Sequence, residues 1–336
     1  MKVLSLFDGI SCGRVALDRA GIQVDKYCAY EIEKTAIQIA QKNWPDIEEK
    51  GDVFAANFAD YRGFDLLIGG SPCTYWSIAQ KADRRETENS GLGWDLFSQY
   101  IRALKEGEIP YFLYENNYSM DDGIRAEITK AFNEVMEDRK KNFPEHTAQY
   151  KAACNYSKIE PIHINSSLVS AQSRDRLYWT NIPNFVMPKN AGITLQSILE
   201  FGHADRNKAL CLARRYAGFQ GTESYQCRRY FGKSFGQAVF ASKEARDQVY
   251  NEWKANPYFD KGKLVEKDPH KRRIRQLTVT ECERLQTLPD GYTQGAGVSD
   301  AMCIEAIGNG WTCDIIKNFF MGFSREGQPK KFDFGV

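Results

Sequence analysis

The sequence lacks the features that mark several common protein classes. It contains no run of about 18 apolar residues, the length that a membrane-spanning helix needs, and its first residues turn acidic and glycine-rich too soon for a signal peptide. Its nine cysteines are an odd number, and none forms a C-x-x-C pair. These absences argue against a disulfide framework and a structural zinc site. We therefore expect a cytoplasmic protein with free thiols, no bound metal and no membrane contact.

Internal repeats and low-complexity tracts are also absent. The chain has 336 residues, of which 42% are apolar and 26% charged, and these proportions are typical of a folded protein rather than a disordered one. At about 150 residues per domain, this length predicts two structural units, or one large domain with an insertion.

The whole chain has almost no excess of either charge, because 45 Lys and Arg residues oppose 44 Asp and Glu residues. Taken alone, this balance argues mildly against a polyanionic partner. However, residues 205–275 hold 17 basic and 8 acidic residues, a net charge of +9, and the remainder of the chain has a net charge of −8. Because phosphate binding needs only a local cluster of cations, the basic segment is a candidate nucleic-acid contact.

Strands and helices are predicted to alternate through the first half of the chain. Strands are expected at 3–7, 27–30, 64–68, 111–114, about 150–154 and about 176–179, with a short third element at 52–53. Helices are expected after the first glycine turn, at 34–43, near 96–105 and near 124–137. This alternation predicts an α/β fold with a mostly parallel sheet covered on both faces.

The pattern changes near residue 183, where the alternation ends and glycine, tyrosine and arginine become frequent. Helical periodicity returns at Thr280 and again at Ser299. We therefore expect one domain made of residues 1–184 and 274–336, and a smaller irregular domain made of residues 185–273.

Asp8, Glu31, Asp52, Glu115 and the segment 71–73 each lie where a predicted strand ends. Ligands of parallel sheets bind at the carboxyl ends of the strands, so these residues are expected to gather at one edge.

The first of these strand ends is the turn from Phe7 to Gly13, whose glycines allow a ligand to approach the backbone closely. The turn does not match G-x-G-x-x-G, so it does not specifically support a dinucleotide, and a tight turn of any such fold is the alternative. Glu31 stands where an acid can accept hydrogen bonds from a ribose diol, although in isolation it is also typical of a solvated surface.

Cys73, in the turn Ser71-Pro72-Cys73, is a candidate nucleophile. Most cysteines are inert, small apolar residues, but this one follows a Gly-Gly-Ser-Pro turn at the expected ligand edge. Glu115 is expected at the same edge. A thiolate beside a carboxyl group that can hold a proton can add to an electron-poor ring and protonate it.

Gln172, Arg174 and Arg176 alternate along the sequence, so on an extended segment their side chains point to one face. Such a set either forms a salt-bridged strand edge or a fork of donors that grips a carbonyl oxygen or a phosphate.

Eight motifs in their order and spacing resemble the cytosine-C5 DNA methyltransferases. They are Phe7-Asp8-Gly9, Glu31, Asp52, Gly70-Ser71-Pro72-Cys73, Glu115-Asn116, Gln172-x-Arg174-x-Arg176, Glu283-Arg284-Leu285-Gln286 and Gly308-Asn309-Gly310. The resemblance covers nearly the whole chain except the insertion. The first turn and the ending at Trp311 are similar to the catalytic domain of the animal de novo subgroup, and the stretch from Arg275 to Asp290 is similar to bacterial and phage relatives.

The resemblance implies a Rossmann-like, doubly wound class I methyltransferase fold whose smaller domain recognises the DNA target. It also implies S-adenosylmethionine as the methyl donor, S-adenosylhomocysteine as its product and double-stranded DNA as the substrate. The protein would act as a monomer in the cytoplasm of a prokaryote, encoded either by that prokaryote or by a phage that infects it. Its role would be one such as restriction-modification.

The family pattern implies two sets of site residues. Phe7 would pack against the cofactor, Glu31 would hold its ribose hydroxyls and Asp52 would accept from its adenine amino group. Asp8 and Cys12 stand where bacterial relatives more usually have Ala and Gly, and Trp311 replaces a smaller residue. The full cofactor set is Phe7, Asp8, Gly9, Ile10, Cys12, Glu31, Ile32, Asp52, Val53, Ser71, Asn309, Gly310 and Trp311, and the catalytic set is Pro72, Cys73, Glu115, Asn116, Arg174 and Arg176.

By the same resemblance, the Cys73 thiolate adds to cytosine C6 while Glu115 stabilises charge at N3. Arg176 binds O2 with support from Arg174, and Asn116 orients the nucleophile's loop. The target base must leave the stack, at a cost of a few kcal/mol.

Two further segments are expected to contact DNA. Residues 74–94 are polar and too long for a simple connection, which favours a lid over a merely solvated loop. The candidate DNA contacts are Arg84 and Arg85 in that segment and Arg214, Arg215, Arg228, Arg229, Lys233 and Gln237 in the insertion.

Two alternatives stay open. A branch of the same family methylates transfer RNA, and a non-catalytic DNA-binding partner is a third interpretation. The intact Cys73, Glu115 and Arg176 argue against the last of these.

Overall fold

The computed structural model describes residues 1–72, 76, 90–142, 150, 153, 158–219, 221–234 and 236–324. The chain divides into two compact units, and neither is a continuous stretch of sequence. Unit 1 comprises Met1–Asn165, Asp175–Met187 and Asp314–Val336, and unit 2 comprises Ser166–Arg174 and Pro188–Cys313.

Unit 1 is built on a seven-stranded sheet with the strand order β3-β2-β1-β4-β5-β7-β6. Its strands are β1 (Lys2–Leu6), β2 (Lys26–Tyr30), β3 (Glu48–Glu49), β4 (Leu66–Gly69), β5 (Tyr111–Asn117), β6 (Ile162–Asn165) and β7 (Asp175–Thr180). The first five are parallel, and β7 runs antiparallel to both β5 and β6. The predicted α/β fold with a mostly parallel sheet is confirmed.

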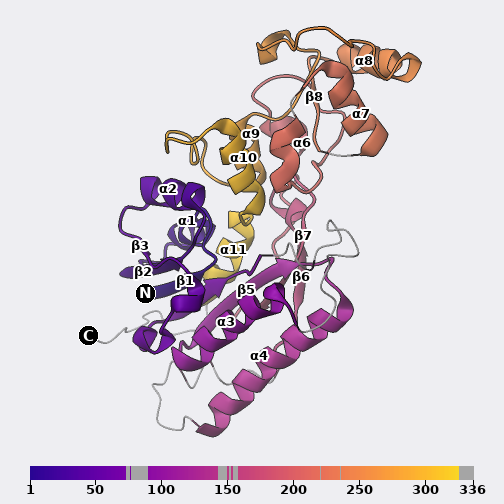
Figure 1. Ribbon diagram of the computed structural model, residues 1–336. Coiled ribbons are helices and arrows are strands. Elements are labelled where there is room, and N and C mark those ends of the chain that lie inside the picture. The colour runs from indigo at the N-terminus through magenta and orange to yellow at the C-terminus, as the bar shows by residue number, and fades with distance from the viewer. Residues whose placement is uncertain are drawn as a thin grey trace. The chain divides into compact units, whose positions relative to one another are not determined.

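Helices α1 (Cys12–Arg19), α2 (Lys34–Asn43), α3 (Leu92–Glu106) and α4 (Asp122–Asn142) connect these strands. The helices α3 and α4 lie together beside β5, as Figure 1 shows. Buried residues from β1, β4 and β5 share one core cluster with residues from these two helices, because alternate side chains of a strand face the same side of the sheet.

Aromatic rings dominate that core next to β5. Phe132 of α4 stacks on Phe112 with ring centroids 4.9 Å apart and also packs edge-on against Tyr100 of α3. Tyr100 in turn lies 4.9 Å from Tyr114. These rings are fully buried, so they fix β5 firmly up to the residue that precedes Glu115.

The second half of the sheet differs from the prediction. Tyr150 and Ala153, the described residues of the strand expected at 150–154, are helical. The strand β6 lies instead at Ile162–Asn165, where only part of its surface is buried and pairing with β7 determines its conformation. Its short, half-polar sequence carries too weak a period to be recognised alone.

Unit 2 contains short helices and one small sheet. Its described elements are η5 (Ser166–Leu168), α6 (Leu195–Ile198), η6 (Arg214–Phe219), α7 (Glu223–Lys233), β8 (Val239–Phe240), α8 (Lys243–Ala255), η7 (Pro269–Lys271), β9 (Ile274–Arg275), α9 (Val279–Leu285) and α10 (Asp300–Asn309). The helix α11 (Cys313–Phe320) begins at the boundary and continues in unit 1. The expected boundary at residue 185 lies near the observed one at Pro188. Residues 274–313, however, belong to unit 2 rather than to unit 1, because α10 packs against η6 and α9.

Two expected absences can be compared with the described part of the chain. None of its helices is both long and apolar enough to cross a membrane. Its residues also include no group of three or more His, Cys, Asp or Glu side chains placed to hold a metal ion. All seven described cysteines are free thiols.

Candidate active site

The turn after β1 is held in an uncommon backbone conformation. Phe7, Gly9 and Ser11 all have φ values near +60°, a region that costs energy for residues other than glycine. No atom lies within 4 Å of the position that a Cβ on Gly9 would occupy. The turn therefore presents open backbone at the carboxyl end of β1, as expected for close approach of a ligand.

Asp8 organises this turn from inside. Its carboxylate accepts hydrogen bonds from the hydroxyl groups of Ser5 at 2.5 Å, Tyr27 at 2.6 Å, and Ser11. Burial raises the pKa of Asp8, and the three hydroxyl donors oppose that rise. The side chain thus supports the turn, and the three hydroxyl partners were not predicted because each comes from a different element.

Glu31 lies where β2 ends and binds the same turn. Its Oε2 accepts from the Gly9 amide at 2.7 Å, and its Oε1 accepts from the amides of Ile32 and Glu33 at 2.8 and 2.9 Å. A carboxylate offers about four lone-pair sites, so three amide bonds leave acceptor capacity for a ligand hydroxyl. The structure brings Glu31 and Gly9 together as the sequence predicted.

Asp52 precedes the short helix η1 (Val53–Ala55) and caps it by accepting from the Phe54 amide at 3.0 Å. Glu49, at the end of β3, was not recognised from the sequence. Both of its carboxylate oxygens are buried without a hydrogen-bond partner among the described residues. Burial, with the nearby charges of Asp8 and Glu31, raises the pKa of Glu49 to about 7.

The other expected cofactor residues occupy varied environments. In unit 1, the side chains of Ile10, Cys12 and Val53 are buried, Phe7 is half-buried and Ile32 is 68% exposed. In unit 2, Asn309 is exposed and Trp311 is half-buried. That these residues line one cofactor pocket stays a prediction.

The turn after β4 is anchored by β5. Asn116 is buried and donates its amide to the Ser71 carbonyl oxygen at 3.2 Å and to the Tyr114 hydroxyl at 3.1 Å. The Ser71 and Tyr114 hydroxyls are 2.6 Å apart. These bonds fix the backbone immediately before exposed Pro72, whereas Cys73, the expected nucleophile, lies outside the described residues.

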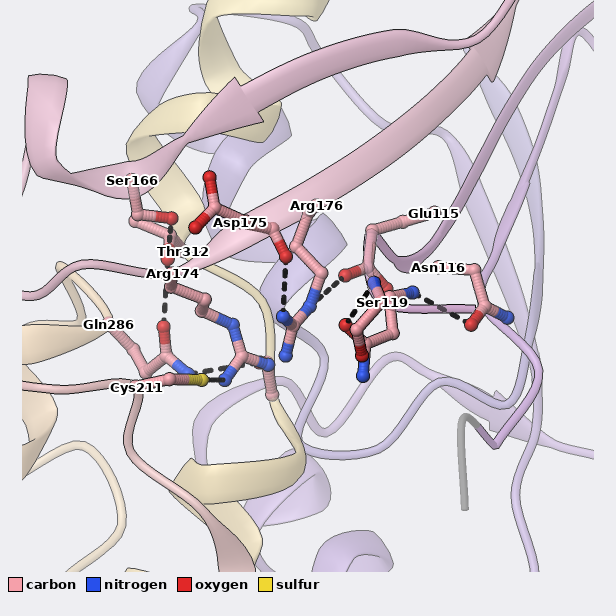
Figure 2. A network of polar contacts seen from close by, with 12 residues as sticks. Glu115, Asn116, Ser119, Ser166, Arg174, Asp175, Arg176, Cys211, Gln286 and Thr312 are labelled. Carbon is pink, nitrogen blue, oxygen red and sulfur yellow. Dashed lines mark hydrogen bonds and ion pairs between the residues drawn. The ribbon is translucent and has the colours of Figure 1, made fainter. Parts of the chain in front are cut away.

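Glu115 and Arg176 form an ion pair at the carboxyl end of β5. Arg176 Nε lies 2.8 Å from Glu115 Oε1, and each side chain is only 10% exposed. Arg176 also donates from Nη1 to the Asp175 carbonyl oxygen at 2.7 Å. Figure 2 shows the guanidinium between these two acceptors. Such a charge-assisted pair fixes both side chains more firmly than a neutral hydrogen bond does.

Arg174 does not join that pair but is buried in unit 2. Its guanidinium donates to the carbonyl oxygens of Leu212 and Gly310 at 3.2 and 2.9 Å. It also contacts Cys211 Sγ at 3.3 Å (Figure 2). Gln172 is fully buried there as well and donates to the Leu285 carbonyl oxygen at 2.6 Å. Both side chains therefore hold unit 2 together around the turn at Gly310.

The expected DNA contacts also differ in their surroundings. Lys233 is exposed, whereas Gln237 is buried and donates to the Leu210 carbonyl oxygen at 3.2 Å. Arg228 donates to the Pro257 carbonyl oxygen at 2.7 Å and covers the Tyr258 ring, with 4.2 Å from its guanidinium carbon to the ring centroid. Arg84, Arg85 and the side chain of Arg215 lie outside the described residues.

Two remaining candidates are also engaged within unit 2. Arg214 pairs with Glu305 at 3.3 Å, and Arg229 lies half-buried near the Tyr225 ring. Both arginines therefore already have partners within unit 2.

Comparison of the fold with solved structures identifies the structural class of the protein. Solved structures with the same Rossmann-like architecture include the Dnmt2 methyltransferase of S. pombe, with a TM-score of 0.63 and 16% identity over 95% of this chain and 96% of that one. A putative DNA modification methyltransferase encoded within an E. coli prophage gives a TM-score of 0.55 and 18% identity over 96% and 98%. The chain thus has the fold of the class I methyltransferases.

Sequence comparison narrows the class to one family. The family model described as C-5 cytosine-specific DNA methylase matches residues 1–322. The chain is 26% identical to the type II methyltransferase M.NlaX of Neisseria lactamica over 94% of both chains, and 25% identical to M1.ScrFI of Lactococcus lactis subsp. cremoris over 92% of this chain and 74% of that one. The chain belongs to the C-5 cytosine-specific DNA methylase family and is a methyltransferase.

Proposed function

We propose that the protein binds double-stranded DNA, turns one cytosine out of the helix and transfers a methyl group from S-adenosylmethionine to its C5 atom. The observation that carries this proposal is the buried Glu115–Arg176 pair beside the anchored Ser71 turn, since that turn leads directly to Cys73.

The surroundings of the first turn fit the proposed cofactor. Open backbone at Gly9, the spare acceptor capacity of Glu31 and the Asp52 carboxylate suit a ribose diol and an adenine amino group. When bound, S-adenosylmethionine supplies an electrophilic methyl group. Glu31 would then hold the ribose, and Asp52 would orient the adenine.

The chemistry requires a nucleophile because cytosine C5 is itself a poor one. The Cys73 thiolate forms a bond to C6, which makes C5 electron-rich enough to take the methyl group. A base then takes the proton from C5, and the C6–S bond breaks as its electron pair returns to the Cys73 sulfur. The product is 5-methylcytosine and the thiolate is restored.

Glu115 and Arg176 act on the pyrimidine while Cys73 adds. A carboxyl group of Glu115 at N3 stabilises the charge that develops there, and the Arg176 guanidinium donates to O2. Their mutual ion pair holds both groups before the base arrives, which lowers the cost of ordering them in the transition state. C5 and C6 lie inside the stacked duplex, so the base must be flipped out to reach them.

A labelling experiment tests this function. Purified protein is incubated with methyl-labelled S-adenosylmethionine and either duplex DNA or transfer RNA, and the wild type is compared with Cys73→Ser. We expect label in DNA cytosine with the wild type and none with Cys73→Ser, because an alkoxide does not form readily near neutral pH.

Cys303→Ser is the matched control, since the Cys303 thiol donates to the Thr293 carbonyl oxygen and a serine hydroxyl can keep that bond. This variant should keep its activity. Label found only in transfer RNA would replace the proposal with the RNA alternative, and no label with either substrate would favour a non-catalytic partner.

A further inference from the structure

A histidine outside the motifs makes two contacts next to the Glu115–Arg176 pair. His163 of β6 lies with Nε2 2.7 Å from Asp175 Oδ1. Its second contact is with Tyr118, whose ring stacks on the imidazole with ring centroids 4.1 Å apart and 24° between the planes. Neither side chain was assigned a role from the sequence.

Together with the chain itself, these contacts connect His163 to both members of the Glu115–Arg176 pair. Tyr118 follows Glu115 by three residues, just after the end of β5, and Asp175 immediately precedes Arg176. Arg176 donates to the Asp175 carbonyl oxygen and pairs with Glu115. The path therefore runs from Glu115 along the chain to Tyr118, through His163 to Asp175, and through Arg176 back to Glu115.

Backbone pairing holds Asp175 and Arg176 of β7 at this end of the sheet, but it does not reach Tyr118. The last paired residues of β5 and β7 are Asn117 and Arg176, so Tyr118 lies beyond the ladder. His163 pairs with Leu177 and reaches Asp175 diagonally on the same face. The histidine thus links Tyr118, which follows β5, to Asp175 of β7, while the β6–β7 ladder continues past it to Asn165 and Asp175.

The side chains of His163, Asp175 and Tyr118 are too exposed for their contacts to contribute much to the free energy of unfolding. The side chains of His163 and Asp175 are 45% and 43% exposed, and Tyr118 is 42% exposed. Ion pairs and hydrogen bonds at such positions contribute little to stability. An effect of these residues should therefore appear in the orientation of Arg176 rather than in the unfolding temperature.

We propose that His163 is a positioning residue, which acts with Asp175 and Tyr118 to hold the Arg176 guanidinium against Glu115. The inference rests on the proposed methyl transfer for its effect on rate, but not for its effect on the ion pair. A misplacement of the guanidinium would weaken its contact with the cytosine O2 and slow the chemical step, while DNA affinity, which phosphate contacts dominate, would change little.

The first test measures turnover. His163→Ala should lower kcat about tenfold or more, because small displacements of a positioned group are costly in rate, with KM for S-adenosylmethionine and the Kd for DNA changed less than twofold. His163→Gln, which keeps a donor for Asp175, should recover part of kcat, and His163→Phe, which keeps only the stack, should recover less. His203→Ala, in unit 2, is the matched control and should keep full activity.

The second test measures coupling. Asp175→Ala and the double variant with His163→Ala should show the same kcat as His163→Ala alone, because all three break the same link. Multiplied losses in the double variant, or a full kcat in His163→Ala, would overturn the inference. A selective loss of DNA affinity in His163→Ala would overturn it too, since that result marks a phosphate contact.

A third measurement does not depend on activity. The side-chain Nε–H signal of Arg176, assigned by its loss in Arg176→Lys, should be sharp and slow to exchange in the wild type and broadened in His163→Ala. An unchanged signal would contradict the positioning role even if the protein methylated nothing. Absence of methylation by the wild type, by contrast, would refute only the proposed function.

Discussion

The Glu49 carboxyl group shows how a single residue can carry a pH dependence. Its oxygens have no hydrogen-bond partner among the described residues, and its pKa is raised to about 7 from an ordinary 4.5 by burial and by Asp8 and Glu31. A carboxyl group with a raised pKa in the folded state favours folding in its protonated form. Its ionisation therefore destabilises the fold progressively as the pH rises from about 4.5 to about 7.

We expect Glu49→Gln to remove this dependence. The difference in free energy of unfolding, variant minus wild type, should increase by about 1–3 kcal/mol between pH 5 and pH 8, because a pKa difference of one unit corresponds to about 1.4 kcal/mol. Chemical denaturation at several pH values measures the difference.

Glu48→Gln is the matched control for this experiment. Hydrogen bonds from Lys50 and Lys26 lower the pKa of Glu48 to about 2, so its contribution changes only below pH 4.5 and the gap to the wild type should stay constant from pH 5 to pH 8. A Glu49→Gln curve parallel to the wild type over that range would show that Glu49 is ionised throughout.

Residue identity predicted only part of the candidate site. Glu115, Glu31 and Gly9 lie where the strand ends placed them, because strand periodicity and the parallel order fix those positions. The alternation of Arg174 and Arg176 predicted one shared face, as either a salt-bridged strand edge or a fork of donors, but tertiary hydrogen bonds give the two guanidinium groups different partners. Contacts that join distant elements leave no periodic signal.

At the scale of elements, Gly308 allows α10 to pack closely against the segment that begins η6. A Cβ at Gly308 would lie 2.7 Å from the Arg214 amide nitrogen and 2.8 Å from the Ala213 carbonyl carbon. Both neighbours are backbone atoms, which cannot move aside as a flexible side chain can.

Gly308→Ala should therefore destabilise unit 2 by about 1–3 kcal/mol, as overpacking of a close contact does. Gly218→Ala, in η6, is the matched control, because nothing lies within 4 Å of its Cβ position. Thermal unfolding followed by circular dichroism compares the two. Equal unfolding temperatures would mean that α10 can shift away from η6 without cost.

The elements with the clearest sequence periods were the best predicted. The amphipathic helix expected at 34–43 matches α2 at both ends, since its apolar spacing and the following Trp-Pro set its limits. The strand β6 was missed because its residues are short of apolar side chains and its conformation depends on β7. Elements with a strong apolar period, such as α2, could be predicted from the sequence. A strand with a weak period, such as β6, could be recognised only from its pairing with β7.

At the scale of the whole molecule, the excess of positive charge lies in residues 205–275, although the whole chain is nearly neutral. The structure shows Arg228 and Arg214 engaged with other groups of unit 2, whereas Lys261, Lys263 and Lys267 are exposed. Exposed lysines keep their charge available for phosphate contacts, so these three are better candidates than the arginines.

Replacing Lys261, Lys263 and Lys267 together by Gln should weaken DNA binding and reduce the slope of log K against log salt by up to about 3, since each lost phosphate contact is worth about 0.9. A matched triple variant of exposed lysines in unit 1, at Lys105, Lys130 and Lys140, changes the net charge equally and should keep the slope. Equal slopes for both triples would assign the phosphate contacts to other residues.

The division of the chain has a consequence for how this protein can be rearranged. The polypeptide passes between the two units four times, at Asn165–Ser166, Arg174–Asp175, Met187–Pro188 and Cys313–Asp314. Two cuts that excise residues 188–313 do not release unit 2 whole, because nine of its residues, Ser166–Arg174, lie between two segments of unit 1. Exchange of residues 188–313 with a relative would therefore leave Gln172 and Arg174 behind, so an exchange of unit 2 must carry two pieces of sequence to preserve one folded body.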